Sequence, residues 1–396
     1  MTAPLAVILI SLAMGGFAIG TTEFATMSLL PYFAPDLGIT AATASHVISA
    51  YALGVVVGAP LLAVLGARQS RRQMLIWLML AFAVFNGLSA LAPNYHIMLA
   101  MRFLSGLPHG AYFGTVALVA ASLVPPQKRA QTVARAMLGL MVATVIGVPL
   151  ANMIGQLAGW RAGFFIVAVL SVLTAALVWR FVPRDVPDAK AHPMREIKGL
   201  RNRHIWLTLA IGAVGFGGLF AVYTYMASTL IHVTGSGEKS VPVVLAILGL
   251  GLTAGALFNS WLADKIGMAA AKYSLMWSAL WLFIYPFATG HYWAMCIVAF
   301  FIGNIGGLGT VLQTRLMDVA RDAQMVSAAL NHSAFNVANA LGPLLAGYAL
   351  TQGWGFPATG FVGCALSLGG LALWGVAMKA AKNDPLDADV QASAAA

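Results

Sequence analysis

Charged side chains are scarce in this sequence. Asp, Glu, Lys and Arg make up 9% of the 396 residues, against about 25% in a typical soluble domain. This deficit excludes a water-soluble enzyme, a nucleic-acid-binding protein and a disordered protein. Cysteine is also scarce, and both cysteines, Cys296 and Cys364, lie inside apolar runs. The sequence therefore indicates neither a disulfide framework nor a metal site.

Motifs for nucleotide hydrolysis and enzymatic chemistry are missing as well. No GxxxxGK[ST] loop occurs, so ATP is not the expected energy source. No HExxH, CxxC or GxSxG motif occurs in the context that its chemistry needs. We therefore expect no cofactor and no enzymatic activity.

Long apolar runs dominate what is present, with 60% of the residues hydrophobic. A membrane helix needs about 20 mostly apolar residues, and transmembrane strands would be shorter and alternate with period two. The sequence predicts an all-α membrane protein with twelve transmembrane helices. They are expected at residues 5–32, 43–65, 73–92, 95–122, 132–157, 161–181, 204–231, 241–262, 270–289, 292–315, 324–350 and 355–378. The first run exceeds the core of a cleavable signal, so we expect it to be retained.

Basic residues predict the orientation. With the N-terminus in the cytoplasm, 19 of the 22 Lys and Arg residues fall in cytoplasmic segments, Arg161 and Lys239 fall on the other side, and Arg102 lies inside a helix. Both termini are therefore expected in the cytoplasm. The longest loop predicts the domain organisation: an N-terminal six-helix bundle at 1–182, a cytoplasmic linker at 183–203, a C-terminal six-helix bundle at 204–380 and a disordered cytoplasmic tail at 381–396.

The two bundles carry an internal repeat. Gly106 and Gly110 of the fourth predicted helix match Gly303 and Gly307 of the tenth at an offset of 197 residues. A proline of the fifth helix matches one in the eleventh at an offset of 194 residues. A fixed offset of about half the chain indicates a repeat architecture. Two parallel six-helix repeats about a central axis are typical of one class of membrane transporters.

Four segments carry a family resemblance: GTTEFATMSLLPYFAPDLGIT at 20–40, RFLSGLPHGAYFG at 102–114, GVPLANMIGQLAGWR at 147–161 and SWLADKIG at 260–267. Together with the helix pattern, they resemble the major facilitator superfamily. Within it, the sequence is similar to the twelve-helix drug:proton antiporters, and most similar to the sugar-efflux and arabinose-efflux permeases. The resemblance implies the major facilitator fold and transport of small molecules.

The resemblance also implies gating residues. One motif lies in the fifth predicted helix, includes Gly147 and Pro149, and shapes the contact between the halves. The other is a loop motif in the second half, and includes Asp264, Lys265 and Gly267. The first-half copy of the loop motif keeps Arg68, Arg71 and Arg72. It has Ala67 where the family usually has Asp, and Ser70 where it usually has Gly. Whether the usual cytoplasmic charge latch forms in the first half is therefore an open question.

Two charged residues lie deep in predicted helices, Glu23 and Arg102. A charge at mid-membrane costs at least about 2.5–3.5 kcal/mol, so each is a candidate for function. At 1.5 Å per residue both lie about 12–14 Å below the periplasmic face. Equal depth permits an ion pair, which we take as a hypothesis. We interpret Glu23 as a proton carrier; the alternative is a buried pair that only fixes two helices.

Further polar and aromatic residues are candidates for proton coupling or substrate binding. His109 lies two turns beyond Arg102, and is either a second proton site or a structural histidine. His332, Asn336 and Asn339 share the eleventh predicted helix, where they either bind substrate or join helices. Aromatic side chains that could line a central cavity for amphipathic ligands are Phe17, Phe24, Tyr51, Tyr112, Phe113, Phe216, Phe220, Tyr223, Tyr225 and Phe335.

The function predicted from these features is proton-coupled secondary active export of small organic molecules, either amphipathic drugs or sugar-like metabolites, by alternating access. We expect a monomer in a bacterial inner membrane, with substrate, protons and lipid as partners and no nucleic acid. The alternative is an uncoupled facilitator or uptake transporter for a sugar, nucleoside or similar metabolite. An intramembrane enzyme would need a nucleophile that we do not find, and a receptor would need larger loops.

Overall fold

The computed structural model of the chain describes residues 3–66, 68–125, 128–185, 202–320 and 324–382, and these residues are helical or in short connections. We call residues 3–185 the N-half and residues 202–382 the C-half. The N-half contains α1 (Leu5–Ser28), α2 (Leu30–Asp36), α3 (Ala41–Gly66), α4 (Arg71–Ala90), α5 (Tyr95–Ser122), α6 (Arg129–Val142), the π-helix η2 (Ala143–Gly147), α7 (Val148–Ala158) and α8 (Trp160–Phe181).

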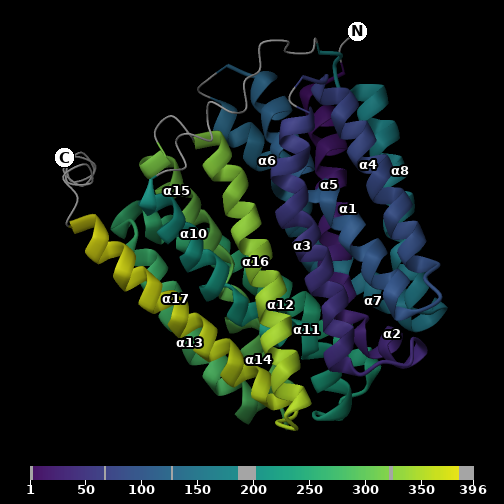
Figure 1. Cartoon of the computed structure of the whole chain (residues 1–396), viewed down its shortest axis with the longest axis vertical. Helices are drawn as coiled ribbons and strands as arrows, with labels where there is room; N and C mark the ends of the chain where they lie inside the picture. Colours follow the sequence, from purple (N-terminus) through teal and green to yellow (C-terminus); the bar gives the residue numbers. More distant parts are fainter. Residues whose placement is uncertain (1–2, 67, 126–127, 186–201, 321–323, 383–396) are drawn as a thin grey trace.

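The C-half has a similar series of helices (Figure 1). It contains α10 (Arg203–Gly215), α11 (Gly217–His232), η4 (Glu238–Ser240), α12 (Val241–Ile266), α13 (Ala269–Ala288), α14 (Tyr292–Gly303), η5 (Asn304–Gly307), α15 (Leu308–Ala320), α16 (Gln324–Thr351), η7 (Phe356–Ala358) and α17 (Thr359–Lys382). Figure 1 shows the start of α1 and the end of α17 at one end of the bundle, which we call the termini end. The opposite end, which holds α2, is called the α2 end.

All twelve predicted runs are helical, and ten segments of the described chain are long and apolar enough to cross a membrane. The helices outside that set, α13 and α16, contain 20 and 28 residues. Trp, Tyr and Ser in α13, and Asn, His and Ser in α16, reduce their hydropathy. The chain is therefore a multi-pass membrane protein, and its count of twelve spans stays a prediction.

Several predicted runs are interrupted for local reasons. The first breaks at Leu29, just before Pro31, which lacks the backbone N–H that a continuing helix needs. The seventh breaks at Phe216 within a glycine-rich stretch, where helix propensity is low. The fifth contains the π-helix η2, which ends two residues before Pro149. Such π-helical turns occur often at functional sites.

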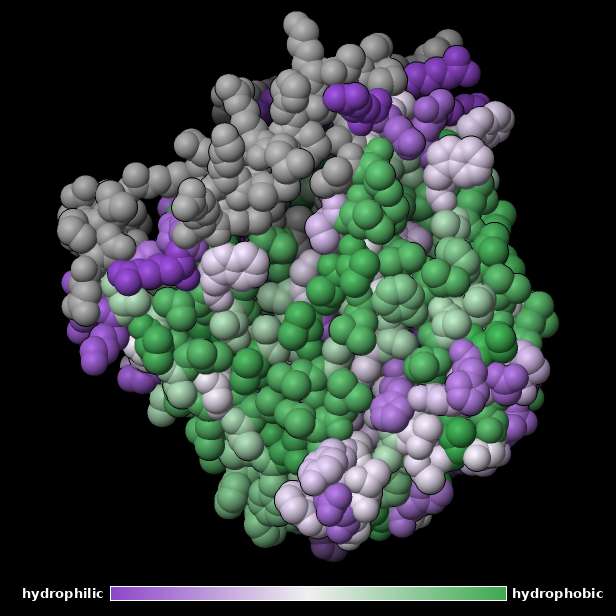
Figure 2. Space-filling view, viewed as in Figure 1, coloured by the Kyte–Doolittle hydropathy of each residue, from purple (hydrophilic) through white to green (hydrophobic). Residues whose placement is uncertain are grey.

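The surface matches a lipid environment. Figure 2 shows hydrophobic residues across the middle of the visible face and hydrophilic residues toward its ends. Large side chains such as Trp77, Leu157, Leu257 and Phe287 are between 67% and 86% exposed. So much apolar surface is not found on soluble monomers, but it has no cost against lipid tails.

Close glycine contacts follow the predicted offset. A Cβ atom on Gly106 of α5 would lie 2.1 Å from the carbonyl oxygen of Tyr51 on α3. A Cβ atom on Gly303 of α14 would lie 2.5 Å from the carbonyl oxygen of Leu248 on α12. Both partners of the second contact follow those of the first by 197 residues. Small residues permit such close approach of membrane helices, and here they do so at equivalent positions of the two halves.

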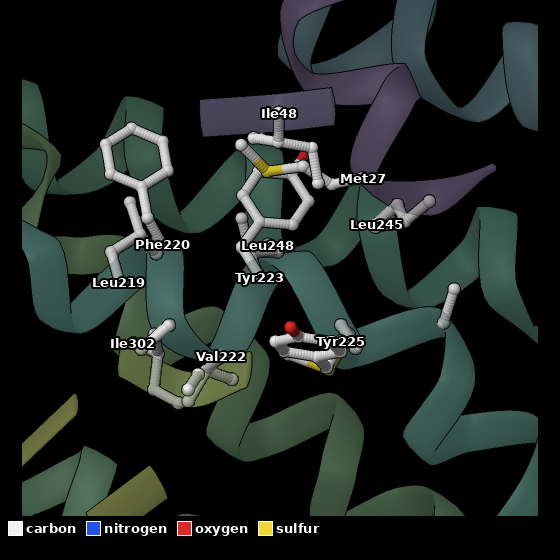
Figure 3. Close-up of a cluster of buried hydrophobic side chains, with 14 of the residues drawn as sticks. Met27, Ile48, Leu219, Phe220, Val222, Tyr223, Tyr225, Leu245, Leu248 and Ile302 are labelled. Atoms are coloured by element: carbon white, nitrogen blue, oxygen red, sulfur yellow. The ribbon is translucent and has the colours of Figure 1, made fainter. Parts of the chain in front are cut away.

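Among the described residues, the halves share a buried core at the α2 end. The largest cluster joins N-half residues of the α2 end, such as Met27 and Ile48, with C-half residues such as Tyr223 and Leu248 (Figure 3). Toward the termini end, the N-half has a separate cluster that includes Leu75. A small third cluster belongs to the C-half alone. The hydrophobic contact between the halves is therefore concentrated at the α2 end.

Candidate functional site

Arg102 on α5 is fully buried within the N-half. Its Nη1 donates hydrogen bonds to Thr22 Oγ1 at 3.2 Å and to Asn86 Oδ1 at 3.3 Å. The Thr22 hydroxyl in turn donates to Asn86 Oδ1 at 2.9 Å. The guanidinium carbon lies 4.3 Å from the centre of the Tyr51 ring, in cation–π contact. The Nε and Nη2 atoms of Arg102 are buried without a hydrogen-bond partner.

Glu23 on α1 is 7% exposed and points away from its own half. Its Oε1 accepts a hydrogen bond of 3.0 Å from Asn339 Nδ2 on α16, in the C-half. The hypothesis of a direct Glu23–Arg102 ion pair is wrong for this structure: among the described residues the ion pair within 4.0 Å is Arg161–Asp36. Thr22 and Asn86 hold the guanidinium, whereas the carboxylate is directed to the opposite half.

The Arg161–Asp36 ion pair lies on the surface of the α2 end. Arg161 Nη1 donates to Asp36 Oδ2 at 2.5 Å, and Trp160 Nε1 donates to the same oxygen at 3.0 Å. These bonds, that from Arg161 first, lower the pKa of Asp36. The position of Glu23 and Arg102 within long apolar runs predicted their burial correctly. The ion pair, however, is formed by the exposed side chains of Arg161 and Asp36.

His109 lies deep in the N-half, as expected. Its Nδ1 is 3.0 Å from the hydroxyl of Tyr51. Its ring also forms a T-shaped contact with Phe113. Phe113 in turn stacks on His332 of the C-half, with ring centres 5.7 Å apart and planes inclined by 3°. The structure therefore brings the two candidate histidines into contact with the same aromatic ring.

Aromatic side chains form a second contact between the halves. Phe24 of α1 stacks on Phe220 and Tyr223 of α11, at centroid distances of 6.3 and 5.6 Å. Phe335 on α16 forms a T-shaped contact with Phe216, with ring centroids 4.6 Å apart. The Phe24 contacts cross between the halves, whereas the Phe216–Phe335 contact lies within the C-half and joins this group through Phe220.

Other candidates lie elsewhere. Tyr112 belongs to the core of the N-half, where its hydroxyl donates to the Leu12 carbonyl at 2.8 Å. Its placement therefore favours a packing role over the predicted cavity role. Tyr225 also packs in the core, with its hydroxyl near the Pro343 carbonyl. Asn336 Nδ2 donates to the His332 carbonyl of its own helix, so only Asn339 of the asparagine pair reaches the other half through a hydrogen bond.

The helix-5 motif lies beside α1. A Cβ atom on Gly147 would lie 2.2 Å from Thr21 Oγ1 and 3.1 Å from the ring of Phe17, so glycine is required for this approach. Pro149 stands in the first turn of α7, where its missing N–H costs least. From the same segment, the Thr144 carbonyl lies 2.4 Å from the Cβ position of Gly249 on α12. The motif thus adjoins the contact between the halves.

The second-half loop motif ends α12. Asp264 and Lys265 are exposed in its last turn, and Lys265 Nζ lies 5.0 Å from the centre of the Trp261 ring. Gly267 follows with φ of +53°, a left-handed conformation that favours glycine. The structure explains the glycine as a helix end, and the charges remain candidates for gating.

The first-half loop motif has a partner that the sequence did not suggest. Asp185, four residues after α8, accepts a hydrogen bond from the Ser70 hydroxyl at 2.6 Å. It also accepts bonds from the backbone N–H groups of Arg71 at 2.7 Å and Arg72 at 3.2 Å, at the start of α4. The Arg72 side chain bonds the Trp179 carbonyl. Arg68 is exposed nearby. Asp185 thus supplies a carboxylate to the start of α4, in a motif that lacks the usual Asp at position 67; Ala67 itself lies outside the described residues.

We expect Asp185→Asn to destabilise the protein by about 1 kcal/mol, because a carboxylate at a helix N-terminus is favoured. Partial burial raises the pKa of Asp185, but the bonds from Ser70, Arg71 and Arg72 outweigh it and hold the pKa below 3.8. The stabilisation should therefore be present above pH 3.8 and be lost as the pH falls through the lower folded-state value. Thermal unfolding in detergent at several pH values measures this. Equal unfolding temperatures at neutral pH would contradict it.

The sequence of this chain matches a known family of membrane transporters. The family model described as Major Facilitator Superfamily matches residues 12–331. The chain belongs to the major facilitator superfamily. It is 36% identical over 376 residues to the inner membrane transport protein YdhP of Escherichia coli O157:H7, covering 95% of this chain and 96% of YdhP. It is 32% identical over 345 residues to the chloramphenicol resistance protein of Streptomyces lividans, covering 85% and 87%.

A solved structure confirms the fold. The bacterial homologue of the human lysosomal transporter Spinster, in an inward-facing and occupied conformation, matches with a TM-score of 0.69 and 14% identity. The match covers 96% of this chain and 98% of the Spinster homologue. The chain is therefore a transporter of the major facilitator fold that handles small molecules, and it is not an enzyme.

Proposed function

We propose that this transporter is a proton-coupled exporter of small organic molecules in a bacterial inner membrane, with Glu23 as the proton carrier. One observation carries the proposal: Glu23 is the buried acidic side chain of the described residues, and it lies where the halves meet. Burying an ionisable group in a membrane protein costs free energy, and such residues are functional candidates for that reason. The relatives support the location and direction, since one is named an inner membrane protein and another a chloramphenicol resistance protein.

The unsatisfied polar groups of α11 and α16, the two C-half helices that hold Tyr223 and Asn339, favour substrates with both apolar and hydrogen-bonding parts. Buried atoms without a hydrogen-bond partner include Asn336 Oδ1, Asn339 Oδ1 and the hydroxyls of Tyr223 and Thr224. Phe24 stacks on Phe220 and on the ring of Tyr223. Binding sites of this composition take amphipathic ligands and orient them through a few polar contacts. We infer that aryl amides and polyhydroxylated molecules are the classes to test first.

The mechanism that we propose is alternating access. The halves share a core at the α2 end and have separate cores toward the termini end. We assign this arrangement to an inward-facing state, with the termini end in the cytoplasm as the basic residues predict. Rocking of the halves about the Glu23 level would then open the α2 end. On this model the protein works as a monomer, and His109 and Arg102 assist the proton step.

The first test is proton release upon addition of substrate to purified protein in detergent. Chloramphenicol, lipophilic cations, pentoses and nucleosides are suitable ligands. We expect at least one to release protons from the wild type, and no release from Glu23→Gln, because the amide cannot ionise. Glu238→Gln is the matched control, since it removes the same charge from an exposed position in η4. Binding without proton release, equal in wild type and Glu23→Gln, would instead favour the uncoupled facilitator.

A further inference from the structure

The bond between Glu23 and Asn339 is a hydrogen bond between the two halves in which one partner can gain a proton. Asn339 Nδ2 donates to Glu23 Oε1 at 3.0 Å, and the two residues lie 316 positions apart in the chain. A neighbouring inter-half bond, from Ser49 Oγ on α3 to the Ala340 carbonyl on α16 at 3.0 Å, involves no titratable group. Only the first of these two contacts can change with protonation.

The amide of Asn339 is complementary to a neutral carboxyl group. Its Nδ2 reaches Glu23, while its Oδ1 is buried without a hydrogen-bond partner. A protonated carboxyl can accept from the amide N–H and donate its own O–H to the amide oxygen. An ionised carboxylate can only accept, and it leaves the Asn339 oxygen unsatisfied, at a cost in free energy.

Arg102, by contrast, is complementary to the ionised form of Glu23. Its Nε and Nη2 are buried donors without a partner, on the same half as Glu23. An ionised carboxylate is a strong acceptor for such donors. Glu23 therefore has two possible partners: an amide on the C-half that suits its neutral form, and a guanidinium on the N-half that suits its ionised form.

Resting on the proposed role of Glu23 as proton carrier, we propose that Asn339 is the coupling residue, which converts protonation of Glu23 into contact between the halves. Protonated Glu23 pairs with Asn339 and stabilises the arrangement seen here. Loss of the proton turns the carboxylate toward Arg102 and releases α16. Asn339 itself carries no proton; it positions Glu23 and transmits its state.

Other titratable groups near Glu23 do not provide this link. Those that interact electrostatically with it among the described residues are Arg102 on α5, Tyr51 on α3 and Tyr223 on α11. The elements α6, η2, α7 and α8 also pack against α1 but add no residue to this set. Of the three, only Tyr223 belongs to the C-half, and it contacts Phe24 rather than Glu23 through its ring.

The test measures the distance between the halves as a function of pH, without substrate. Spin labels at Ser122 on α5 and Thr314 on α15, both exposed, report the separation at the termini end. Cys296 and Cys364 are first replaced by alanine. For the wild type we expect the long-distance population to rise as the pH falls. Glu23→Gln should show the low-pH distribution at every pH, because its amide can pair with Asn339 in both directions.

Asn339→Leu should show no pH response and should resemble the wild type at high pH. Ser49→Ala is the matched control: it removes the adjacent inter-half bond, so the populations shift but the pH response remains. If Asn339 only joined helices, its loss would act like that of Ser49. Asn339→Ala provides a smaller change should the leucine variant fold poorly.

The outcomes separate the two proposals. A wild-type pH response retained in both Asn339 variants overturns the coupling role, as does a wild type without any pH response. Either result leaves Glu23 as the proton carrier if substrate still releases protons in the wild type and not in Glu23→Gln. Absence of that release overturns the proposed function itself.

Discussion

Replacing Arg102 by methionine is expected to abolish transport while leaving the protein at least as stable as the wild type. The guanidinium is fully buried, forms no ion pair among the described residues, and has two donors without partners. Buried charges with incomplete partners cost free energy, and replacing them by apolar residues of similar size is often neutral or stabilises by about 1–4 kcal/mol. We expect a gain of about 1 kcal/mol, at the lower end of that range.

The sign of the change in stability of Arg102→Met distinguishes two roles for Arg102. A residue that only fixes helices would lower the unfolding temperature when removed, and transport would decline with stability. A residue retained for function despite its cost shows the opposite pattern, which is common where stability is traded for activity. Thermal unfolding in detergent and uptake into proteoliposomes measure the two quantities. A less stable Arg102→Met variant that still transports would contradict our interpretation.

Two further variants sharpen this experiment. Arg102→Lys keeps the charge but not the planar fork of donors, so it cannot bond Thr22 and Asn86 while stacking on Tyr51. We expect it to restore little transport. Arg161→Met removes an arginine from the exposed ion pair with Asp36, and exposed pairs contribute about 0–1 kcal/mol. It therefore controls for the general effect of losing an arginine on stability.

The sequence was most informative about residues whose burial is costly. Glu23 and Arg102 stand alone in long apolar runs, and both are buried in the structure. Their partners were harder to find, because a helix periodicity fixes depth but not the direction of a long side chain. Asn86 lies in an apolar run of α4 and could have been identified by the same polarity argument. Thr22 is too common in membrane helices to be noticed.

Contacts between segments far apart in sequence could not be predicted. Asp185 lies in the loop after α8, and nothing in its local sequence indicates that it would reach the start of α4. The direction of Asn339 is a similar case, since Asn336 is three residues away and bonds its own helix. Helix boundaries followed apolar runs well, except where Pro31 and the glycines around Phe216 interrupt them.

The repeat offers a case in which sequence and structure jointly predict a large effect. We expect Gly106→Val to prevent correct folding, because its Cβ atom would lie 2.1 Å from the Tyr51 carbonyl oxygen and 3.0 Å from the backbone N of Val55. Both obstacles are backbone atoms, which cannot move aside as a side chain can. Relief requires α5 and α3 to separate, and this would also displace Arg102 and Tyr51, which lie on those helices.

Gly114→Val is the matched control, because no atom lies within 4 Å of its Cβ position on the same helix. Like Gly106→Val, this variant replaces a glycine of α5 by a β-branched residue. We expect the Gly114 variant to purify as a monodisperse protein with wild-type stability, and the Gly106 variant to aggregate in size-exclusion chromatography. Gly303→Val, at the equivalent position of α14, should fail in the same way, since its Cβ atom would lie 2.5 Å from the Leu248 carbonyl oxygen. A monodisperse Gly106→Val protein would show that the two helices do not approach as closely as this packing requires.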